Sequence, residues 1–238
     1  MWPFSSKTSL FESGVYRGFT DCHCHLLPGV DDGVQKMGDT LKILLAYEQA
    51  GFEEVWFTPH IMEDIPNTTD SLRQRFREVQ SAYKGVLRLH LAAEYMLDNL
   101  FEERLETDDV LPLGTDGRHL LVETSYFNPP VRLQGVLSRI RQKGYHPVLA
   151  HPERYNYMTD KYYDQLKEMG VFFQMNLISL AGAYGEVPQK KALKLLKAGY
   201  IDYLGTDTHR HRVFNFASSE KAFKSSVAGL LRQVPNCL

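Results

Sequence analysis

Short apolar runs alternate with amphipathic segments that end at glycine along nearly the whole chain, and this alternation limits the possible folds more than any other feature. The amphipathic segments carry apolar residues at helical spacing, as at Leu133, Leu137 and Ile140 before Gly144. Strands separated by helices in this way predict parallel β/α units. The seven strand-like runs are 19–26, 53–58, 86–93, 120–124, 147–150, 171–175 and 201–205.

Seven β/α units favour a TIM-like barrel, complete or incomplete, over an open doubly wound sheet. A phosphate-binding GxGxxG or P-loop turn would favour the open sheet, and the sequence contains neither. Asp39 and Asp70 are predicted helix N-caps, and a last helix is predicted over 218–234. No linker divides the chain, so we expect a single α/β domain over 1–238 with an N-terminal extension over 1–15.

The composition excludes several classes of protein. Hydrophobic residues make up 43% and charged residues 24% of the 238 residues, as in ordinary folded proteins. A net charge of −2 gives no electrostatic basis for binding nucleic acid or an anionic membrane. No apolar run reaches the roughly 18 residues of a membrane span, and the start of the chain lacks a signal-peptide core. Three cysteines cannot build a disulfide framework, which predicts a cytoplasmic enzyme.

Potential metal ligands stand at the ends of six of the seven predicted strands. In a β/α barrel the carboxyl ends of the strands converge on one face, where active sites lie. His23 and His25 share a strand face about 6.5 Å apart, and Asp207 and His209 have the same spacing. We therefore predict one metal centre. Its candidate ligands are His23, His25, Asp32, His60, Glu94, Glu123, His151, Asp207 and His209.

The mixture of donors indicates the kind of metal. Imidazole combined with carboxylate suits Mn²⁺, Fe or Zn²⁺ rather than Ca²⁺ or Mg²⁺. The set exceeds the needs of one ion, and Glu94 is the predicted bridge between two or three ions. Each signal alone has a structural alternative. Strand histidines are often only hydrogen-bonded, and Asp31-Asp32-Gly33 is also common turn chemistry.

The remaining histidines and the cysteines are interpreted as structural. His90 lies within a strand run, while His119 and His146 open strands at the opposite end of the predicted barrel; His211 stays undecided. Cys22 and Cys24 alternate with the histidines and should pack away from the metal. Neither is followed six residues later by the arginine that a cysteine-dependent phosphatase requires, which excludes that mechanism.

Three arginines are candidates for binding phosphate near the metal centre. Arg154 follows His151 by three residues, and Arg210 and Arg212 follow His209. Guanidinium groups match the oxygens of a phosphoryl group. A salt bridge from Arg154 to Glu153 or Asp207 is an equally open interpretation.

Longer motifs add a family resemblance. Residues 21–33, Thr58-Pro59-His60, Leu121-Val122-Glu123 and the run His151-Pro152-Glu153-Arg154-Tyr155 resemble the PHP (polymerase and histidinol phosphatase) superfamily. Within it, the chain is most similar to bacterial metal-dependent tyrosine-protein phosphatases of the CpsB/CapC type. The resemblance implies a distorted seven-stranded β/α barrel that holds up to three ions, usually Mn²⁺. It also implies a phosphotyrosine substrate on a bacterial tyrosine kinase that controls polysaccharide export.

The resemblance also implies roles for individual residues. His23, His25, Glu94 and Asp207 would hold one ion; Glu94, His60 and His151 a second; Asp32, Glu123 and His209 a third. Arg154 would hold the substrate phosphate. The stretch from Gly205 to Arg212 departs from the family pattern, so either Arg210 or Arg212 replaces a second phosphate-binding arginine.

We predict that metal-activated water hydrolyses a phosphate monoester, with Asp207 or His209 as general acid and Arg154 stabilising the phosphoryl charge. One alternative is a hydrolase of histidinol phosphate or another small phosphoester. A second is a non-catalytic module that binds metal or kinase without turnover.

Overall fold

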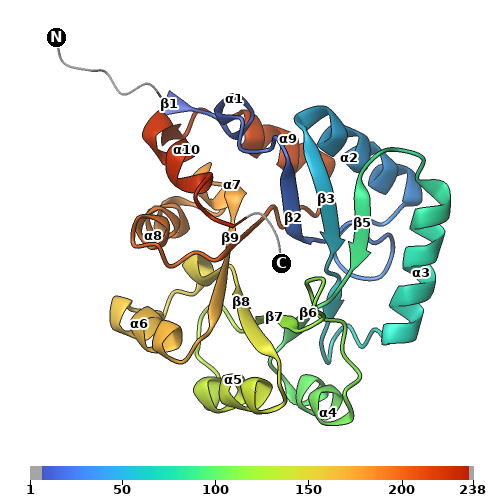
Figure 1. Cartoon of the computed structure of the whole chain (residues 1–238), viewed down its shortest axis with the longest axis vertical. Helices are drawn as coiled ribbons and strands as arrows, with labels where there is room; N and C mark the ends of the chain where they lie inside the picture. The colour runs from blue at the N-terminus through green and yellow to red at the C-terminus, as the bar shows by residue number, and fades with distance from the viewer. Residues whose placement is uncertain (1–6, 236–238) are drawn as a thin grey trace.

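The computed structural model describes residues 7–235, in which parallel strands curl around a common centre with helices on the outside (Figure 1). The strands are β1 (Lys7–Thr8), β2 (Phe19–Cys24), β3 (Phe52–Phe57), β4 (His60–Ile61), β5 (Arg88–Leu91), β6 (Glu94–Met96), β7 (His119–Glu123), β8 (His146–Ala150), β9 (Phe172–Asn176), β10 (Tyr203–Gly205) and β11 (Phe223–Lys224). The helices are α1 (Leu10–Ser13), α2 (Met37–Ala50), α3 (Thr69–Ala82), α4 (Asn99–Thr107), α5 (Leu133–Gln142), α6 (Asp160–Glu168), α7 (Leu177–Leu180), α8 (Glu186–Lys197), α9 (His211–Ser219) and α10 (Ser225–Leu231), with a 3-10 turn η1 (Pro152–Arg154).

The parallel strands form two sheets that meet at their edges. One sheet has the order β10-β9-β8-β7-β6-β4 and the other β2-β3-β5. Between β2 and the segment after β10, the Asp207 N–H donates to the His23 carbonyl at 2.7 Å and the His25 N–H to the Thr208 carbonyl at 3.0 Å. Only Thr58 and Pro59 separate β3 from β4. The fold is therefore a mixed α/β structure with a curled parallel sheet.

All seven predicted strands are present, with boundaries that move by a few residues. The run predicted over 86–93 contains β5, which pairs with β3. Glu94 was expected at the end of this strand, but it begins a separate short strand, β6, which pairs with β4 and β7 and places Glu94 in the second sheet. The break falls at Ala92 and Ala93, both fully buried.

The predicted helix over 218–234 is wrong, because the chain forms α9, the short strand β11 and then α10. Phe223 in β11 is buried and pairs antiparallel with Thr8 in β1, so a tertiary pairing overrides the helical pattern. The predicted N-caps are also wrong. Asp39 lies inside α2, and the α3 cap is Thr68, whose hydroxyl accepts the Ser71 N–H.

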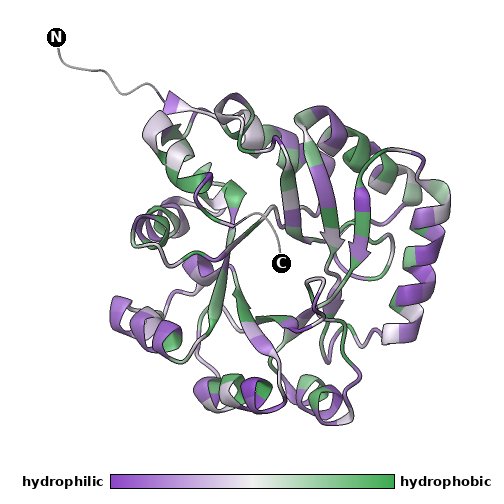
Figure 2. Cartoon of the chain, in the orientation of Figure 1, coloured by the Kyte–Doolittle hydropathy of each residue, from purple (hydrophilic) through white to green (hydrophobic). Residues whose placement is uncertain are grey.

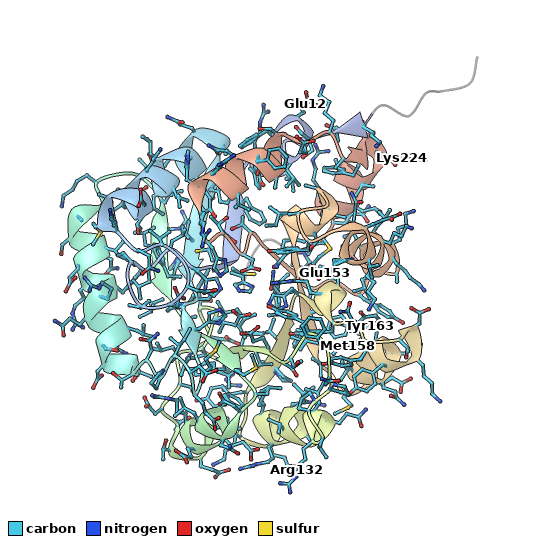
Figure 3. The ribbon with its side chains drawn as sticks, turned by 180° about the vertical axis from the view of Figure 1, so that it is seen from behind. Glu12, Arg132, Glu153, Met158, Tyr163 and Lys224 are labelled. Carbon is cyan, nitrogen blue, oxygen red and sulfur yellow. The ribbon has the colours of Figure 1, made fainter. Side chains whose placement is uncertain are left out.

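Apolar side chains from the strands and the inner helix faces make one large core and a smaller cluster around Trp56 and Leu121. Helices such as α3 and α6 carry many hydrophilic residues where they face outward (Figure 2). Side chains also fill the middle of the molecule, while Arg132 and Lys224 lie at its rim (Figure 3). Across 7–235, none of the helices combines the length and apolar character of a membrane span.

At Gly205, the last residue of β10, the packing of β10 against β2 leaves no room for a side chain. A Cβ there would lie 2.6 Å from the His23 Cβ and 2.8 Å from Gln174 Nε2. We expect Gly205→Ala to lower the free energy of unfolding by about 1–3 kcal/mol, the usual effect of overpacking. Chemical denaturation measures this, with Gly229→Ala in α10, where a Cβ meets nothing within 4 Å, as the matched control. Equal stabilities for the two variants would contradict the close packing.

Candidate metal centre

The nine predicted ligands converge on one cavity of about 440 Å³ at the carboxyl ends of the strands. His23 comes from β2, Glu94 from the start of β6, Glu123 from the end of β7, and His151 directly follows β8. Asp32, His60, Glu94, His151, Asp207 and His209 line the cavity. His23, His25 and Glu123 are buried beside them. The chain order places these residues far apart, and the curled sheet brings them together.

Glu94 lies at the centre of this group. Its Oε2 is 3.3 Å from the Nε2 atoms of both His23 and His25 and 3.1 Å from Nδ1 of His60. Its Oε1 is 3.1 Å from Nε2 of His151. One buried carboxylate thus faces four imidazoles, three with Oε2 and one with Oε1. A ligand that bridges two ions needs two oxygens that point to different positions in this way.

The side chains divide into overlapping groups whose donor atoms lie within 4.8 Å of one another. The groups are His25, Asp32, His60 and His209; His23, His25 and Asp207; His23, Glu94 and His151; and His60, Glu94 and Glu123. Only the group of His23, His25 and Asp207 falls within one ligand set implied by the resemblance, and the other three groups combine residues from different sets. Glu123 lies with His60, 3.2 Å from its Nδ1, whereas Asp32 lies 3.4 Å from Nε2 of His209.

His151 and Asp207 reach the cavity through unusual backbone. Both adopt left-handed conformations, with φ of 36° and 52°, which non-glycine residues rarely take. Such strain persists only where the surrounding structure enforces it, and it is typical of functional sites. Here it turns each side chain inward directly after a strand.

Two side chains that the sequence interpretation did not assign to the site orient the histidines. The Oδ2 of Asp31 lies 2.9 Å from Nδ1 of His25, and Oε1 of Gln174 lies 2.8 Å from Nδ1 of His23. In each case the partner leaves Nε2 directed at Glu94. Metal-ligating histidines usually have such a partner on the other ring nitrogen. The i, i+6 spacing from His25 to Asp31 is within a loop, and no local pattern marks Gln174.

Gln174 offers a test of this orientation. Replacing it with methionine keeps the length of the side chain but removes the acceptor for His23 Nδ1. We expect metal affinity to fall about 10- to 100-fold, the usual effect of losing such a partner. Calorimetric titration of the metal-free protein with Mn²⁺ measures it. Gln189→Met, whose amide bonds the Leu180 carbonyl in α7, is the matched control, and equal affinities in both variants would count against the assignment.

The charges in the centre depend on one another. Burial opposes charge on His23, but Glu94 and Asp207 outweigh it and raise the pKa of this imidazole to about 9. Burial would raise the pKa of Glu94, but His23 and His60 hold it well below its usual range. Burial would also raise the pKa of Asp207, but the nearby His23 and His209 outweigh it and lower the carboxyl pKa. The buried carboxylates therefore remain ionised and require positive charge beside them.

The residues fit a divalent metal ion. Nδ1 of His60 is buried and has no hydrogen-bond partner among the described residues, although it faces the carboxylates of Glu94 and Glu123. An unpaired buried nitrogen between carboxylates costs free energy unless something else occupies its lone pair. Mixed imidazole and carboxylate donors are those of Mn²⁺, Fe and Zn²⁺ sites.

Arg154 faces the same cavity from η1. Its guanidinium bonds Oδ2 of Asp207 at 3.1 Å and lies between two aromatic rings, 4.3 Å from the centre of Tyr126 and 4.2 Å from that of Tyr184. The ion pair with Asp207 that the sequence left open is present, and phosphate binding by Arg154 stays a prediction. Tyr184, which also donates to Asp207 at 2.8 Å, was not predicted, because only the tertiary fold brings it to Arg154.

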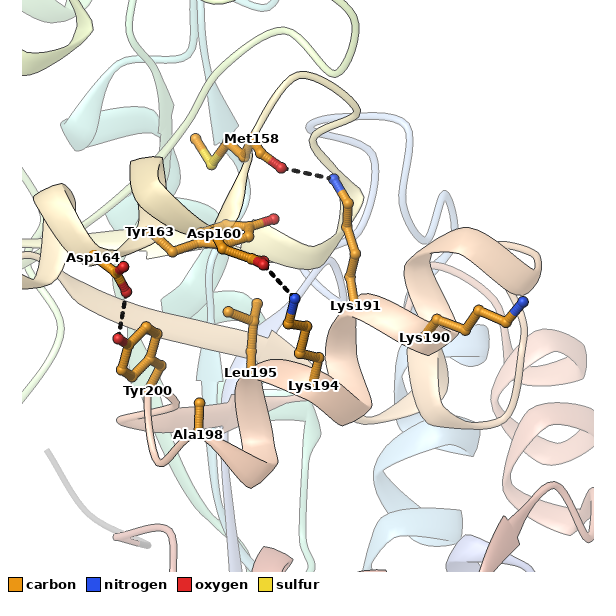
Figure 4. Close-up of a pocket in the computed structure, with 10 residues that line it drawn as sticks. All are labelled: Met158, Asp160, Tyr163, Asp164, Lys190, Lys191, Lys194, Leu195, Ala198 and Tyr200. Carbon is orange, nitrogen blue, oxygen red and sulfur yellow. Dashed lines mark hydrogen bonds and ion pairs between the residues drawn. The ribbon is translucent and has the colours of Figure 1, made fainter.

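Hydrogen bonds from α8, which lies outside the metal centre, hold the segment that follows Arg154. Lys191 in α8 donates to the carbonyls of Tyr155 at 2.6 Å and Met158 at 3.2 Å, beside a second cavity between α6 and α8 (Figure 4). Behind Arg154, the buried Glu153 accepts the Ser179 hydroxyl at 2.7 Å and the Asn176 N–H at 3.0 Å. The loop that presents Arg154 is therefore held on both sides.

The other two candidate arginines differ in position. Arg210 lines the cavity, whereas Arg212, two residues into α9, is exposed and not among the described residues that line it. Cys22 and Cys24 are buried and bond backbone carbonyls of Leu204 and Trp56, away from the centre. The third cysteine, Cys237, lies outside the described residues.

Comparison with known proteins places this geometry in context. The family described as "Capsular polysaccharide synthesis, CpsB/CapC" matches residues 19–218. Tyrosine-protein phosphatase YwqE of Bacillus subtilis is 27% identical over 209 residues, covering 85% of this chain and 82% of that protein. Tyrosine-protein phosphatase CpsB of Streptococcus pneumoniae is 28% identical over 202 residues, covering 79% and 82%.

A solved structure agrees with the sequence relatives. It belongs to a study of YwqE from Bacillus subtilis and CpsB from Streptococcus pneumoniae, described as unique metal-dependent tyrosine phosphatases. It superposes with a TM-score of 0.72 at 25% identity and covers 90% of this chain and 86% of its own. The matched region contains every candidate ligand and Arg154, and the chain belongs to the CpsB/CapC family.

Proposed function

We propose that this chain is a metal-dependent tyrosine-protein phosphatase that hydrolyses phosphotyrosine without a cysteine nucleophile. The observation that carries the proposal is one cavity in which Glu94 faces four imidazoles and Arg154 presents a guanidinium group beside them. The relatives named as tyrosine-protein phosphatases support the substrate class. Both cysteines near the centre are buried and hydrogen-bonded elsewhere, which supports a mechanism that does not use them.

We assign the nine predicted ligands to two or three divalent ions, with Mn²⁺ as the preferred metal. Glu94 would be the shared ligand, His23, His25 and Asp207 would hold one ion, and His60, Glu123 and His151 would hold the next. Asp32 and His209 complete the set with His25 and His60. Bound divalent ions supply Lewis acidity and lower the pKa of water.

The chain's own polar groups bind and orient the phosphoryl group. Arg154 is held in place by Asp207, Tyr126 and Tyr184, so its planar group can receive phosphoryl oxygens with little loss of side-chain freedom. The carboxyl pKa of Asp207 is lowered, which suits a ligand better than a general acid. His209, a quarter exposed at the cavity, would take the proton-donor role only in a two-ion centre in which it holds no metal. A phenol leaving group, with a pKa near 10, needs only modest help.

The family membership supports a proposal for the physiological setting. We propose a cytoplasmic enzyme of one domain over 1–238, including the segment over 1–15, of which 1–6 lie outside the described residues. In it the two sheets act as one distorted (β/α)7 barrel. The proposed substrate is the autophosphorylated tail of a bacterial tyrosine kinase that controls polysaccharide export.

Phosphate release from a phosphotyrosyl peptide and from histidinol phosphate, each with Mn²⁺ and with EDTA, tests the function. We expect metal-dependent release that favours the peptide. Preference for histidinol phosphate would replace this proposal with a small-molecule phosphatase on the same centre. No release from either substrate, with metal bound and kinase retained, would leave a non-catalytic module instead.

The same assay distinguishes Arg210 from Arg212 as the second phosphate-binding arginine. We expect Arg210→Ala to raise KM for the phosphotyrosyl peptide about 10- to 100-fold, since one charge-assisted contact to phosphate is worth about 1.5–3 kcal/mol. Arg212→Ala should change KM less than twofold, because the described residues that line the cavity include Arg210 but not Arg212. Steady-state kinetics with Mn²⁺ measures both. The reverse order would move the second phosphate contact to Arg212.

A further inference from the structure

A second group of metal-binding side chains lies at the opposite end of the same strands. Asp116, His119 and His146 each offer a ligand atom, and these atoms lie within 4.8 Å of one another. His119 is the first residue of β7 and His146 the first of β8. The candidate centre described above lies at the other end of these strands, with Glu123 four residues after His119, about 13 Å along a strand.

Strand register is what brings the two imidazoles together. His119 and His146 are direct partners in the parallel pairing of β7 and β8. Their ring centres lie 5.0 Å apart with an angle of 39° between the planes. Neighbouring strands lie about 4.8 Å apart, so side chains of paired residues on one face of the sheet lie side by side at about this distance. The sequence showed both histidines at strand starts but not that they are partners.

Asp116 completes the group from the turn that precedes β7. Its Oδ1 lies 3.3 Å from Nδ1 of His119 and also accepts the Arg118 N–H at 3.1 Å. The turn is closed by reciprocal backbone bonds between Leu113 and His119. Ligand atoms around a tetrahedral zinc ion, each 2.0–2.1 Å from the metal, lie about 3.3 Å apart. The Asp116–His119 separation already matches this value.

The surroundings resemble the apolar shell of a metal site more than an ordinary surface ion pair. Phe172, the first residue of β9, lies 5.5 Å from the ring centre of His119 and 5.8 Å from that of His146. Tyr203, the first residue of β10, lies 5.8 Å from His119. His119 is only 9% exposed, while the Asp116 side chain is about half exposed. Asp116 is therefore the open side of the group, and the aromatic rings pack against the imidazoles on the other side.

We propose that Asp116, His119 and His146 form a second metal site, for a borderline divalent ion of the Zn²⁺ class. Two imidazoles and one carboxylate form a three-ligand zinc set with one open position. An ion there would join the 113–119 turn to the starts of β7 and β8. Its expected role is to stabilise this end of the sheet rather than to take part in phosphate hydrolysis.

The test counts zinc on the full chain. Metal-free protein is equilibrated with Zn²⁺, separated from free ion and measured by plasma mass spectrometry. We expect His146→Gln and Asp116→Asn each to retain one Zn²⁺ fewer per chain than the wild type, or to bind that ion at least tenfold more weakly. His90→Gln is the matched control, because His90 stacks on Trp56 and bonds Glu54 outside any such group.

A second measurement keeps the proposal testable if a variant folds poorly. In the wild type, Zn²⁺ should shift the imidazole ¹⁵N signals of His119 and His146, assigned by their loss in His119→Gln and His146→Gln. Mn²⁺-dependent phosphate release by Asp116→Asn should stay within twofold of the wild type, which separates this site from the catalytic proposal. Equal zinc counts in wild type and both variants, or unmoved ring signals, would reduce the group to a histidine–aspartate ion pair and overturn the proposal.

Discussion

Replacing Glu94 with glutamine is expected to lower kcat/KM for a phosphotyrosyl peptide at least 100-fold and to remove bound metal. Glu94 is 1% exposed, and its two oxygens face the imidazoles of His23, His25, His60 and His151 at 3.1–3.3 Å. Glutamine has the same shape but turns one oxygen into a neutral N–H donor, which cannot bind a cation. Because the loss of a mere supporting hydrogen bond lowers metal affinity 10- to 100-fold, loss of the shared carboxylate should exceed that range.

Metal content and turnover are measured together on the same preparation, by plasma mass spectrometry and phosphate release. Glu54→Gln is the matched control. Glu54 also lies on a strand, 3.1 Å from a histidine, His90, but outside the centre, so it should keep both metal and activity. A Glu94→Gln enzyme with wild-type turnover would show that the four-histidine arrangement is structural only.

Replacing Arg154 with lysine is expected to lower kcat/KM about 100-fold while metal content stays unchanged. Lysine keeps the charge but loses the planar fork and the stacking between Tyr126 and Tyr184. Loss of one positioned donor to developing oxyanion charge typically lowers kcat by about 10²–10³. The same assay with Mn²⁺ measures it, together with the metal count.

Arg132→Lys, at the rim of the molecule before α5, is the control for the substitution itself. Loss of metal in Arg154→Lys would mean that Arg154 acts by positioning Asp207, since the two are bonded at 3.1 Å. Unchanged kinetics would remove Arg154 from phosphate binding.

The strand–helix alternation allowed much of the site to be anticipated. A strand end is a local property of the chain, and parallel strands bring their carboxyl ends to one face whatever their order. His151 and Asp207 could therefore be assigned to one pocket before any contact was known, whereas Glu94, expected at a strand end, reaches the pocket from the start of β6. The helix boundaries were less predictable where a long-range pairing decided them, as for β11 and Phe223.

The residues that escaped prediction act across strands. Gln174 reaches His23 over 151 positions, and Tyr184 reaches Asp207 over 23. Neither carries a charge or stands in a motif, so no local signal marks it. Asp31 was visible in the sequence, but its turn chemistry hid its bond to His25.

By itself, the sequence determined the fold class, the face on which the ligands meet and the exclusion of a cysteine nucleophile, because each depends on residue type and local spacing. Tertiary structure alone decided which candidate ligands lie within reach of one another, which arginine faces the cavity and which histidines are neighbours at the far end. Strand register and sheet curvature set those relations. Both arise from packing between segments that are distant in the chain, and no local pattern records them.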